Sequence, residues 1–522
     1  MKKTLCGWVV VMAAGHPAWA AQEDAVSKTH WIAQCEALAR ADFSGILDAP
    51  TQITVAQPVA TASDVPAYCR VEGYVSPNVG IEVRLPATQW NGKFIEVGCG
   101  GTCGAVFASA CDEPLRKAYA CIASDMGHKG HKSTLADQIW AYNNLQAKID
   151  FGFRATHVAA LAGKAITERY YGKRPARSYF VGCSTGGRQG LVEAQRFPWD
   201  FNGIIAGAPA MYWPAINMGF LWQALTLKGN DGAALLGSAD IKLVHQAAIA
   251  QCDRDDGLVD GVIGHPRACR FDPASLACSA GTSTGCLSRP QVQALQKLYA
   301  GLTTPTGDRI SQSLLPGAET ELRWMMSENP LSLDPLRNQD MFRYGAFLPD
   351  PGPTWKASDM DYARDYQRLG MMEAIYGASN PDLREFKAAG GKLLLYHGWG
   401  DVLPPQNTVD YYETVERTMG GRAATQDFLR LFMIAGMGHC GGGEGAWAID
   451  YLSHLEAWVE QGRAPDMLLG AHVKEDNVVD VRLPLDPAQI SFTRPVYPYP
   501  LWARYKGTGN PNDAASFRPA ER

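Results

Sequence analysis

The stretch Ser178-Tyr179-Phe180-Val181-Gly182-Cys183-Ser184-Thr185-Gly186 places a G-x-S-x-G pattern directly after a short apolar run. The run predicts a buried strand, and helical spacing follows as far as Arg196. A sharp turn between a strand and a helix lifts a serine hydroxyl above the sheet, beside a helix N-terminus that favours developing negative charge. An ordinary glycine-rich turn is the alternative, but this context and Cys183 favour Ser184 as a nucleophile.

Strands alternate with helices on both sides of this stretch. The alternation predicts a mainly parallel sheet covered on both faces, that is, an α/β fold. It breaks near Ala208-Pro209, and residues 210–385 are rich in Trp, Met, Pro and polar turns. We expect an α/β-hydrolase core (21–209 and 386–522) interrupted by a large inserted lid domain (210–385). The expected strands are 69–75, 94–97, 119–124, 178–181, 203–207, 392–397 and 428–434, and the expected helices include 31–41 and 153–171.

An acid and a base follow later in the chain. In α/β-hydrolases the order is serine, acid, histidine. Asp401 comes shortly after the predicted strand 392–397, and His439 comes after the predicted strand 428–434. Both therefore lie at C-terminal strand ends, where open sheets assemble their sites. Asp410 is the alternative acid, but it lies in a helical-looking stretch and is expected to be solvated.

Two cysteines flank the candidate nucleophile and base. Cys183 precedes Ser184, and Cys440 follows His439. If these cysteines pair, their Cα atoms lie roughly 4.4–6.8 Å apart. The bridge brings the serine and the histidine together although they are distant in sequence. Such a covalent link between the flanks of a nucleophile and a base points to a hydrolase.

At these residues the chain resembles the tannase/feruloyl esterase family, whose serine and histidine are flanked by disulfide-bonded cysteines. The family includes feruloyl esterases, tannases and mono(2-hydroxyethyl) terephthalate hydrolase. The resemblance covers most of the mature chain, including Trp90-Asn91-Gly92-Lys93-Phe94, His397-Gly398 through Asp401, and Pro498-Tyr499-Pro500 through Gly507. It implies a serine carboxylesterase that hydrolyses an ester of an aromatic acid through an acyl-enzyme. Feruloyl esterase is the leading activity, followed by hydrolysis of a terephthalate-type monoester and then by tannase.

Ester hydrolysis also needs an oxyanion hole, usually made of two backbone N–H groups. One is expected from Thr185, the residue after the nucleophile. The other is expected from the loop of residues 98–104, where the family resemblance favours Gly101. A tight turn without a chemical role is the alternative for this loop.

The resemblance also implies disulfide bonds and a calcium ion. The implied pairs are Cys183–Cys440, Cys35–Cys69, Cys252–Cys269 and Cys278–Cys286. The chain departs from its relatives by having four more cysteines near the oxyanion loop, for which three pairings are possible: Cys99, Cys103, Cys111 and Cys121.

Residues 252–262 concentrate four carboxylates, a repulsion that a hard cation relieves. The spacing is not that of an EF-hand, and a plain acidic loop is the alternative. The resemblance implies structural Ca²⁺ in the lid, with Asp255 pointing to solvent. Its ligands are expected to be the side chains of Asp253, Asp256 and Asp260 and the carbonyls of Leu258 and Val262.

Lid residues are expected to contact the substrate, but the sequence does not single them out. Aromatic residues of the lid either stack on an aromatic acyl group or form the lid's own core: Trp213, Trp222, Trp324, Phe342, Tyr344, Phe347 and Trp355. A monoester with a free carboxylate needs a cation, for which Arg337 and Arg343 are candidates. A hypothesis from another class is an inactive calcium-dependent binding module. A thiol–disulfide oxidoreductase is a weaker alternative, since no C-x-x-C occurs.

The N-terminus and the composition limit the location and the partners. Residues 1–20 carry two lysines, an apolar stretch and Ala18-Trp19-Ala20, which predicts a signal peptide and a secreted or periplasmic enzyme. Its removal changes the formal charge from −5 to −7 and leaves twelve of the 13 cysteines, an even number typical of disulfides. The chain lacks a long basic run, which argues against nucleic acid or a membrane as partner. The partner is expected to be a small aromatic ester, and the oligomeric state is left open.

Overall fold

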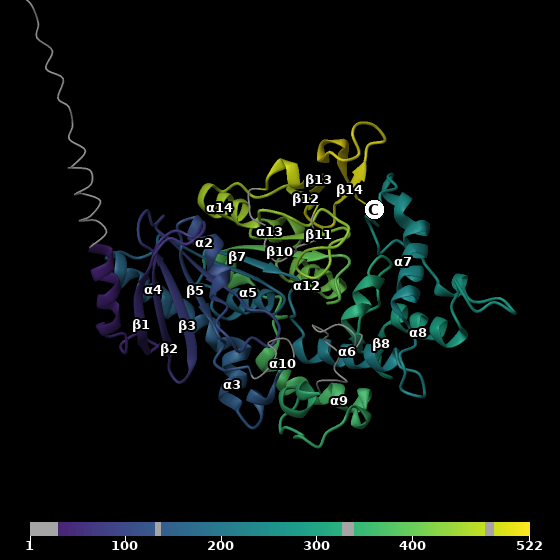
Figure 1. Cartoon of the computed structure of the whole chain (residues 1–522), viewed down its shortest axis with the longest axis horizontal. Coiled ribbons are helices and arrows are strands. Elements are labelled where there is room, and N and C mark those ends of the chain that lie inside the picture. Colours follow the sequence, from purple (N-terminus) through teal and green to yellow (C-terminus); the bar gives the residue numbers. More distant parts are fainter. Residues whose placement is uncertain (1–29, 131–136, 326–338, 475–484, 522) are drawn as a thin grey trace, which may run out of the picture.

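A nine-stranded sheet forms the centre of the molecule (Figure 1). The computed structural model describes residues 30–130, 137–325, 339–474 and 485–521. The strand order is β1-β2-β3-β5-β4-β6-β7-β10-β11. The bounds are β1 Thr51–Val59, β2 Tyr68–Val75, β3 Val79–Pro86, β4 Lys93–Val97, β5 Ala120–Ser124, β6 Arg177–Cys183, β7 Gly203–Gly207, β10 Lys392–Gly398 and β11 Leu429–Ile434.

The sheet consists of an antiparallel part and a parallel part. The neighbours from β5 to β11 all pair in parallel, which confirms the predicted α/β core. The pairs β1–β2, β2–β3 and β3–β5 are antiparallel, so the N-terminal third differs from the mainly parallel sheet that we expected. β1 and β3 were not predicted from the sequence.

Alternate residues of the central strands enter two separate hydrophobic cores, one on each face of the sheet. On β4, Phe94 belongs to one core and Ile95 to the other. On β10, Leu393 and Leu395 belong to the first core and Leu394 to the second. This period of two is what a strand buried on both faces requires.

Helices cover both faces of the sheet (Figure 1). α4 (Ala155–Tyr171) packs against β5, α5 (Thr185–Arg196) against β6 and β7, and α14 (Tyr451–Gln461) against β7 and β10. α4 ends at Gly172, whose φ of 70° is the left-handed conformation that a C-terminal glycine provides. The helix expected over 31–41 is helical over residues 30–37 and continues as the 3₁₀ turn Leu38–Arg40.

A long segment is inserted between β7 and β10, which are neighbours in the sheet. Its longer helices lie together beside the sheet in Figure 1: α6 Trp213–Thr226, α7 Ser238–Cys252, α8 Arg289–Ala300, α9 Tyr362–Arg368 and α10 Gly370–Tyr376. The predicted insertion is therefore present between two neighbouring strands of the sheet. That residues 210–385 form a separate lid domain stays a prediction. After the core, two short hairpins follow: β12 (Leu468–Val473) with β13 (Ile490–Val496), and β14 (Trp502–Tyr505) with β15 (Phe517–Ala520).

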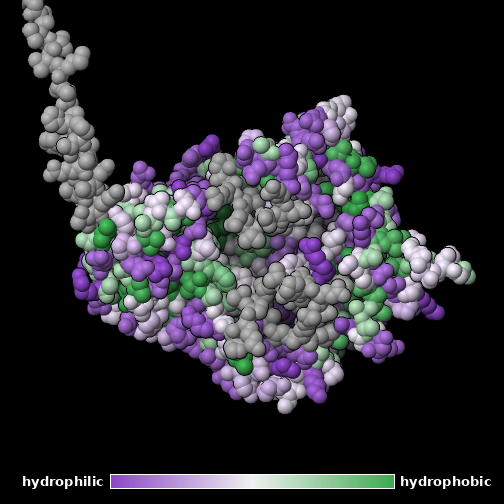
Figure 2. Space-filling view, in the orientation of Figure 1, coloured by the Kyte–Doolittle hydropathy of each residue, from purple (hydrophilic) through white to green (hydrophobic). Residues whose placement is uncertain are grey.

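The described part of the face shown in Figure 2 mixes hydrophilic and hydrophobic side chains without a continuous apolar band. None of the described helices combines the length and the apolar character that crossing a membrane requires. The predicted signal peptide lies outside the described residues.

Candidate active site

Ser184 stands on a sharp turn between β6 and α5, with a φ of 64°. This left-handed conformation is rare for a residue with a side chain and is characteristic of a nucleophile elbow. The surrounding glycines are required by close packing. A Cβ on Gly182 would lie 2.6 Å from the carbonyl carbon of Gly186, and a Cβ on Gly187 would lie 2.1 Å from the oxygen of Gly207. The backbone of the turn thus packs so tightly that only glycine fits.

His439 and Asp401 form a hydrogen-bonded pair. The Nδ1 atom of His439 lies 2.9 Å from each carboxylate oxygen of Asp401. Asp401 is buried, whereas the side chain of His439 is 23% exposed. The alternative acid, Asp410, lies on α12 (Pro405–Thr418), where its Oδ2 accepts a hydrogen bond from Gln312 at 3.0 Å. Of the two candidate acids, the structure brings Asp401 to the histidine.

A second histidine binds Asp401 from within the core. His397 is buried at the end of β10, and its Nε2 lies 3.0 Å from Oδ2 of Asp401. Its Nδ1 lies 2.8 Å from the hydroxyl of Thr408, and the backbone N–H of Leu403 donates to Oδ1 of Asp401 at 2.7 Å. From the sequence, His397 is interpreted as a packing residue that shapes the turn before Asp401. It does more than that, because it contacts the carboxylate itself.

The charges of this group shift the pKa values of acid and base in opposite directions. Burial by itself raises the pKa of Asp401, but the two histidines outweigh burial and hold that pKa well below its usual range. Burial by itself lowers the pKa of His439, but Asp401 and Glu321 reverse the effect and raise it. Asp401 is therefore a carboxylate at neutral pH, and its charge stabilises a protonated imidazole.

The disulfide Cys183–Cys440 links the turn that carries Ser184 to the loop that carries His439. Its Cα atoms are 6.0 Å apart, within the range expected from the sequence. Among the described residues, the side chain of Ser184 makes no hydrogen bond to His439, so that contact stays a prediction. Such bonds are often long in a ligand-free site and shorten when substrate binds.

The loop expected to form the oxyanion hole is attached to the elbow. The hydroxyl of Thr185 donates to the carbonyl oxygen of Gly101 at 2.5 Å. The side chain of Gln189, on α5, accepts from the backbone N–H of Cys99 at 3.3 Å. Cys99 and Cys103 form a disulfide across this loop, with Cα atoms 5.6 Å apart. Thr185 and Gly101 thus lie side by side, and their role as oxyanion donors stays a prediction.

The pairing of all twelve cysteines of the expected mature chain is defined. The four pairs implied by the resemblance are all present: Cys35–Cys69, Cys183–Cys440, Cys252–Cys269 and Cys278–Cys286. The open pairing resolves as Cys99–Cys103 and Cys111–Cys121. Spacing alone left three choices, because only the fold brings the start of β5 next to the short helix that precedes it.

The donor set of the acidic loop fits a calcium ion in its chemistry. Asp253 and Asp256 are buried, and Asp255 is exposed as expected. Burial, with repulsion from Asp260 and Asp253, raises the pKa of Asp256 to about 7. Oδ2 of Asp260 forms an ion pair with Arg494 at 2.6 Å, which already neutralises one of the expected ligands. Asp253 and Asp256 are buried oxygen donors of the kind that Ca²⁺ prefers, whereas Asp260 is exposed, and the three carboxylates do not all lie within 4.8 Å of one another.

The aromatic residues of the insertion mostly pack against one another or against the core. Phe342 lies 5.1 Å from Trp355 between ring centroids and 6.3 Å from Phe347, and all three are buried. Trp213 contacts Phe151 of the core at 5.6 Å. These four side chains form internal packing, which was the alternative to substrate stacking. Tyr344 is also buried, and Trp222 and Trp324 are partly buried.

Of the two candidate cations for a substrate carboxylate, only Arg343 lies in the described residues. Its Nε donates to the carbonyl oxygen of Trp355 at 3.1 Å, and its guanidinium lies 3.6 Å from Asp340. Arg343 is therefore already engaged in holding the insertion together. Arg337 lies outside the described residues.

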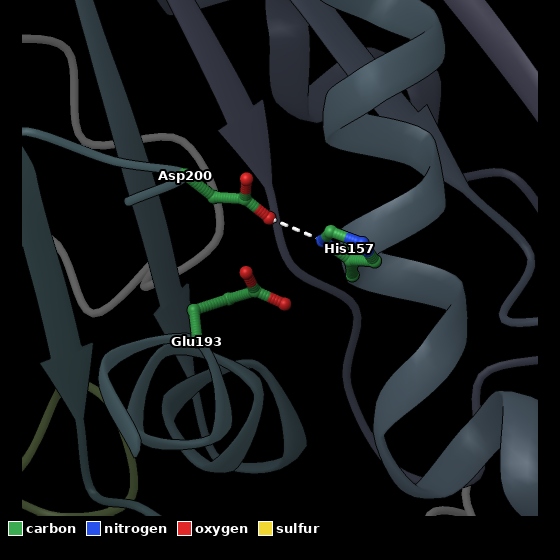
Figure 3. A group of neighbouring side chains, drawn as sticks. All are labelled: His157, Glu193 and Asp200. Carbon is green, nitrogen blue, oxygen red and sulfur yellow. Dashed lines mark hydrogen bonds and ion pairs between the residues drawn. The ribbon is translucent and has the colours of Figure 1, made fainter. Parts of the chain in front are cut away.

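A buried ionisable group lies away from the triad, between α4 and α5 (Figure 3). In the described part of the chain, one set of three or more His, Cys, Asp or Glu residues has its ligand atoms within 4.8 Å of one another. This set consists of His157, Glu193 and Asp200. Nδ1 of His157 lies 2.5 Å from Asp200. Burial raises the pKa of Glu193 well above its ordinary value, which favours the neutral form of this carboxyl. The His157–Asp200 contact joins α4 to the loop before β7, and Glu193 approaches it from α5.

Comparison with known proteins identifies the relatives of this chain. The family model described as tannase and feruloyl esterase matches residues 63–338 and 352–520. The chain belongs to this family. An uncharacterized esterase of Xanthomonas campestris pv. campestris is 35% identical, covering 91% of this chain and 88% of that protein. A mono(2-hydroxyethyl) terephthalate hydrolase of Piscinibacter sakaiensis is 32% identical, covering 93% and 91%.

A solved structure shares the fold. The crystal structure of feruloyl esterase B from Aspergillus oryzae superposes with a TM-score of 0.80 at 27% identity, covering 94% of this chain and 100% of that one. The chain is thus a tannase-family carboxylic ester hydrolase with an α/β-hydrolase fold. The expected family, fold and enzyme class are confirmed.

Proposed function

We propose that this family member is an exported serine esterase that hydrolyses esters of aromatic carboxylic acids, with Ser184, Asp401 and His439 as its triad. The observation that carries the proposal is the His439–Asp401 hydrogen-bonded pair, joined to the serine turn by Cys183–Cys440. The order of the three residues in the chain and their positions at strand ends agree with the α/β-hydrolase pattern.

In this mechanism His439 takes the proton of Ser184 as the hydroxyl attacks the ester carbonyl. Asp401 orients the imidazole and stabilises its positive charge, while His397 holds Asp401 in place. The backbone N–H groups of Gly101 and Thr185 receive the oxyanion. His439 then protonates the leaving alcohol, and water releases the aromatic acid from the acyl-enzyme.

Feruloyl-type esters are the preferred substrates in this proposal, and a terephthalate-type monoester is the second candidate. The second candidate draws support from the 32% identity to the Piscinibacter sakaiensis hydrolase. It ranks lower because Arg343 is already bound to Asp340 and Trp355. Tannase activity ranks third.

A hydrolysis panel tests the proposal: methyl ferulate, methyl gallate and mono(2-hydroxyethyl) terephthalate, each with the wild-type enzyme and Ser184→Ala. We expect the highest kcat/KM on methyl ferulate and a loss of at least about 10⁴-fold in Ser184→Ala. Equal hydrolysis by the variant would contradict the assigned nucleophile. A preference for the terephthalate monoester would replace the proposed substrate and leave the mechanism unchanged.

Calcium and export complete the proposal. Ca²⁺ is proposed to be held by the carboxylates of Asp253, Asp256 and Asp260 and the carbonyls of Leu258 and Val262. Its role there is structural, since the loop packs against the C-terminal strands through the Asp260–Arg494 ion pair. Export is supported by the six disulfides, which form and persist in oxidising compartments.

A further inference from the structure

A buried carboxylate of the inserted segment faces the loop of the catalytic histidine. Glu321 lies in the short helix Glu319–Met325 and is 7% exposed. A Cβ built on Gly438, the residue before His439, would lie 3.5 Å from Oε1 of Glu321. Glu321 and Asp401 also line the same small cavity, beside Trp399. The insertion therefore delivers a second carboxylate to the neighbourhood of the imidazole.

Two neighbours hold this carboxylate in place. The indole N–H of Trp324 donates to Oε2 of Glu321 at 2.8 Å, and the guanidinium of Arg323 lies 3.2 Å from Oε1. Arg323 is 62% exposed, so water screens its charge, whereas the side chain of Glu321 is only 10% exposed. Burial raises the pKa of Glu321, whereas Arg323, Trp324 and His439 act in the opposite direction and favour its charged form.

We propose that Glu321 is a positioning residue for the catalytic base, a lid carboxylate that stabilises the protonated imidazole of His439 and thereby sets the lower pH limit of activity. The inference rests on the proposed function, because it acts through the same histidine. Asp401 is hydrogen-bonded to this histidine, and Glu321 lies beside the residue before it, Gly438. His397 acts on His439 through Asp401, and Arg323 acts through Glu321.

The sign of the effect follows from electrostatics. Both carboxylates favour the charged imidazole, and Glu321 contributes to the raised pKa of His439 after Asp401. General-base catalysis requires neutral His439, so a higher pKa moves the acid limb of the kcat/KM profile to higher pH. Removing the charge of Glu321 should therefore shift this limb to lower pH.

The experiment measures kcat/KM on methyl ferulate from pH 4 to 9 for the wild type, Glu321→Gln, Glu321→Asp and Glu319→Gln. We expect the midpoint of the acid limb to fall by about half a pH unit in Glu321→Gln, which makes the variant about threefold faster than wild type on the acid side. Glu321→Asp keeps the charge and should keep the midpoint. Glu319→Gln is the matched control, since that buried carboxylate faces His245 and Tyr299 instead.

A second variant, expected to shift the midpoint of the acid limb in the opposite direction, distinguishes an electrostatic effect from a general loosening of the site. Arg323→Gln removes the exposed cation beside Glu321 and should raise the midpoint. A structural disturbance would lower the plateau in both variants without moving the midpoints in opposite directions. An unchanged midpoint in Glu321→Gln, in an enzyme that hydrolyses the ester, overturns this inference alone. Wild-type protein that hydrolyses no ester overturns the proposed function instead.

Discussion

The nucleophile and the base of this site are held by different means. Ser184 stands on a turn where Gly182 and Gly187 leave no room for a side chain, so backbone packing fixes its place. The position of the loop that carries His439 depends on a disulfide, and the pKa of its imidazole depends on nearby charges, chiefly Asp401. Substitution of Gly182 or Gly187 should therefore disturb the fold, whereas changes on the base side should alter the chemistry of a folded enzyme.

Removing the acid tests the base side with the largest expected effect. We expect Asp401→Asn to lower kcat by about 10⁴-fold in a folded protein, because the amide no longer stabilises the protonated imidazole or selects its tautomer. The matched control is Asp410→Asn, whose carboxylate binds Gln312. Steady-state kinetics and circular dichroism check the result. A dead Asp410→Asn beside an active Asp401→Asn would mean that the wrong acid is assigned.

Opening the bridge between the two sides tests whether they depend on each other. We expect Cys183→Ala/Cys440→Ala to lose about 100-fold in kcat per folded molecule, since a small displacement of base from nucleophile is costly. The comparison is Cys278→Ala/Cys286→Ala, which removes a bridge in the insertion. Both are assayed well below their melting temperatures. Equal activity per folded molecule would make the Cys183–Cys440 bridge a purely structural one.

Removing calcium should affect stability and leave the chemistry nearly unchanged. We expect a chelator to lower Tm by several degrees and added Ca²⁺ to restore it, because the ion binds only the folded loop. Asp256→Ala should imitate the chelator, whereas Asp255→Ala, at an exposed position, should not. Differential scanning calorimetry measures both. If metal-free protein melts at the same temperature with and without Ca²⁺, the loop is a plain acidic one.

Sequence patterns predicted the nucleophile side better than the base side. A strand, two glycines, a serine and a helix are neighbours in the chain, so Ser184 and its turn follow from local rules. Asp401 and His439 followed from chain order and strand ends. The contact between His397 and Asp401 was missed, because a buried histidine after a strand looks like any packing residue.

The contribution of the insertion to the active site could not be predicted from the sequence. Glu321 reaches the histidine loop through the packing of a segment without a repeating pattern, and no spacing marks it among the other carboxylates. The antiparallel strands β1 and β3 are 9 and 8 residues long and were missed for another reason: β1 lies at the edge of the sheet, where polar residues and Pro58 interrupt its apolar pattern. The alternation of Val79, Ile81, Val83 and Leu85, all buried in β3, was the signal that could have revealed one of them.

The most direct test of the account is the labelling of the serine by a fluorophosphonate probe. Intact-mass and peptide mass spectrometry would follow the reaction in the wild type, Ser184→Ala and Asp401→Asn. The account predicts a single adduct on Ser184 in the wild type, no adduct in Ser184→Ala, and labelling slowed by orders of magnitude in Asp401→Asn. Folded wild-type protein that stays unlabelled, or that is labelled at another serine, would contradict the assigned triad and favour a binding protein without esterase chemistry.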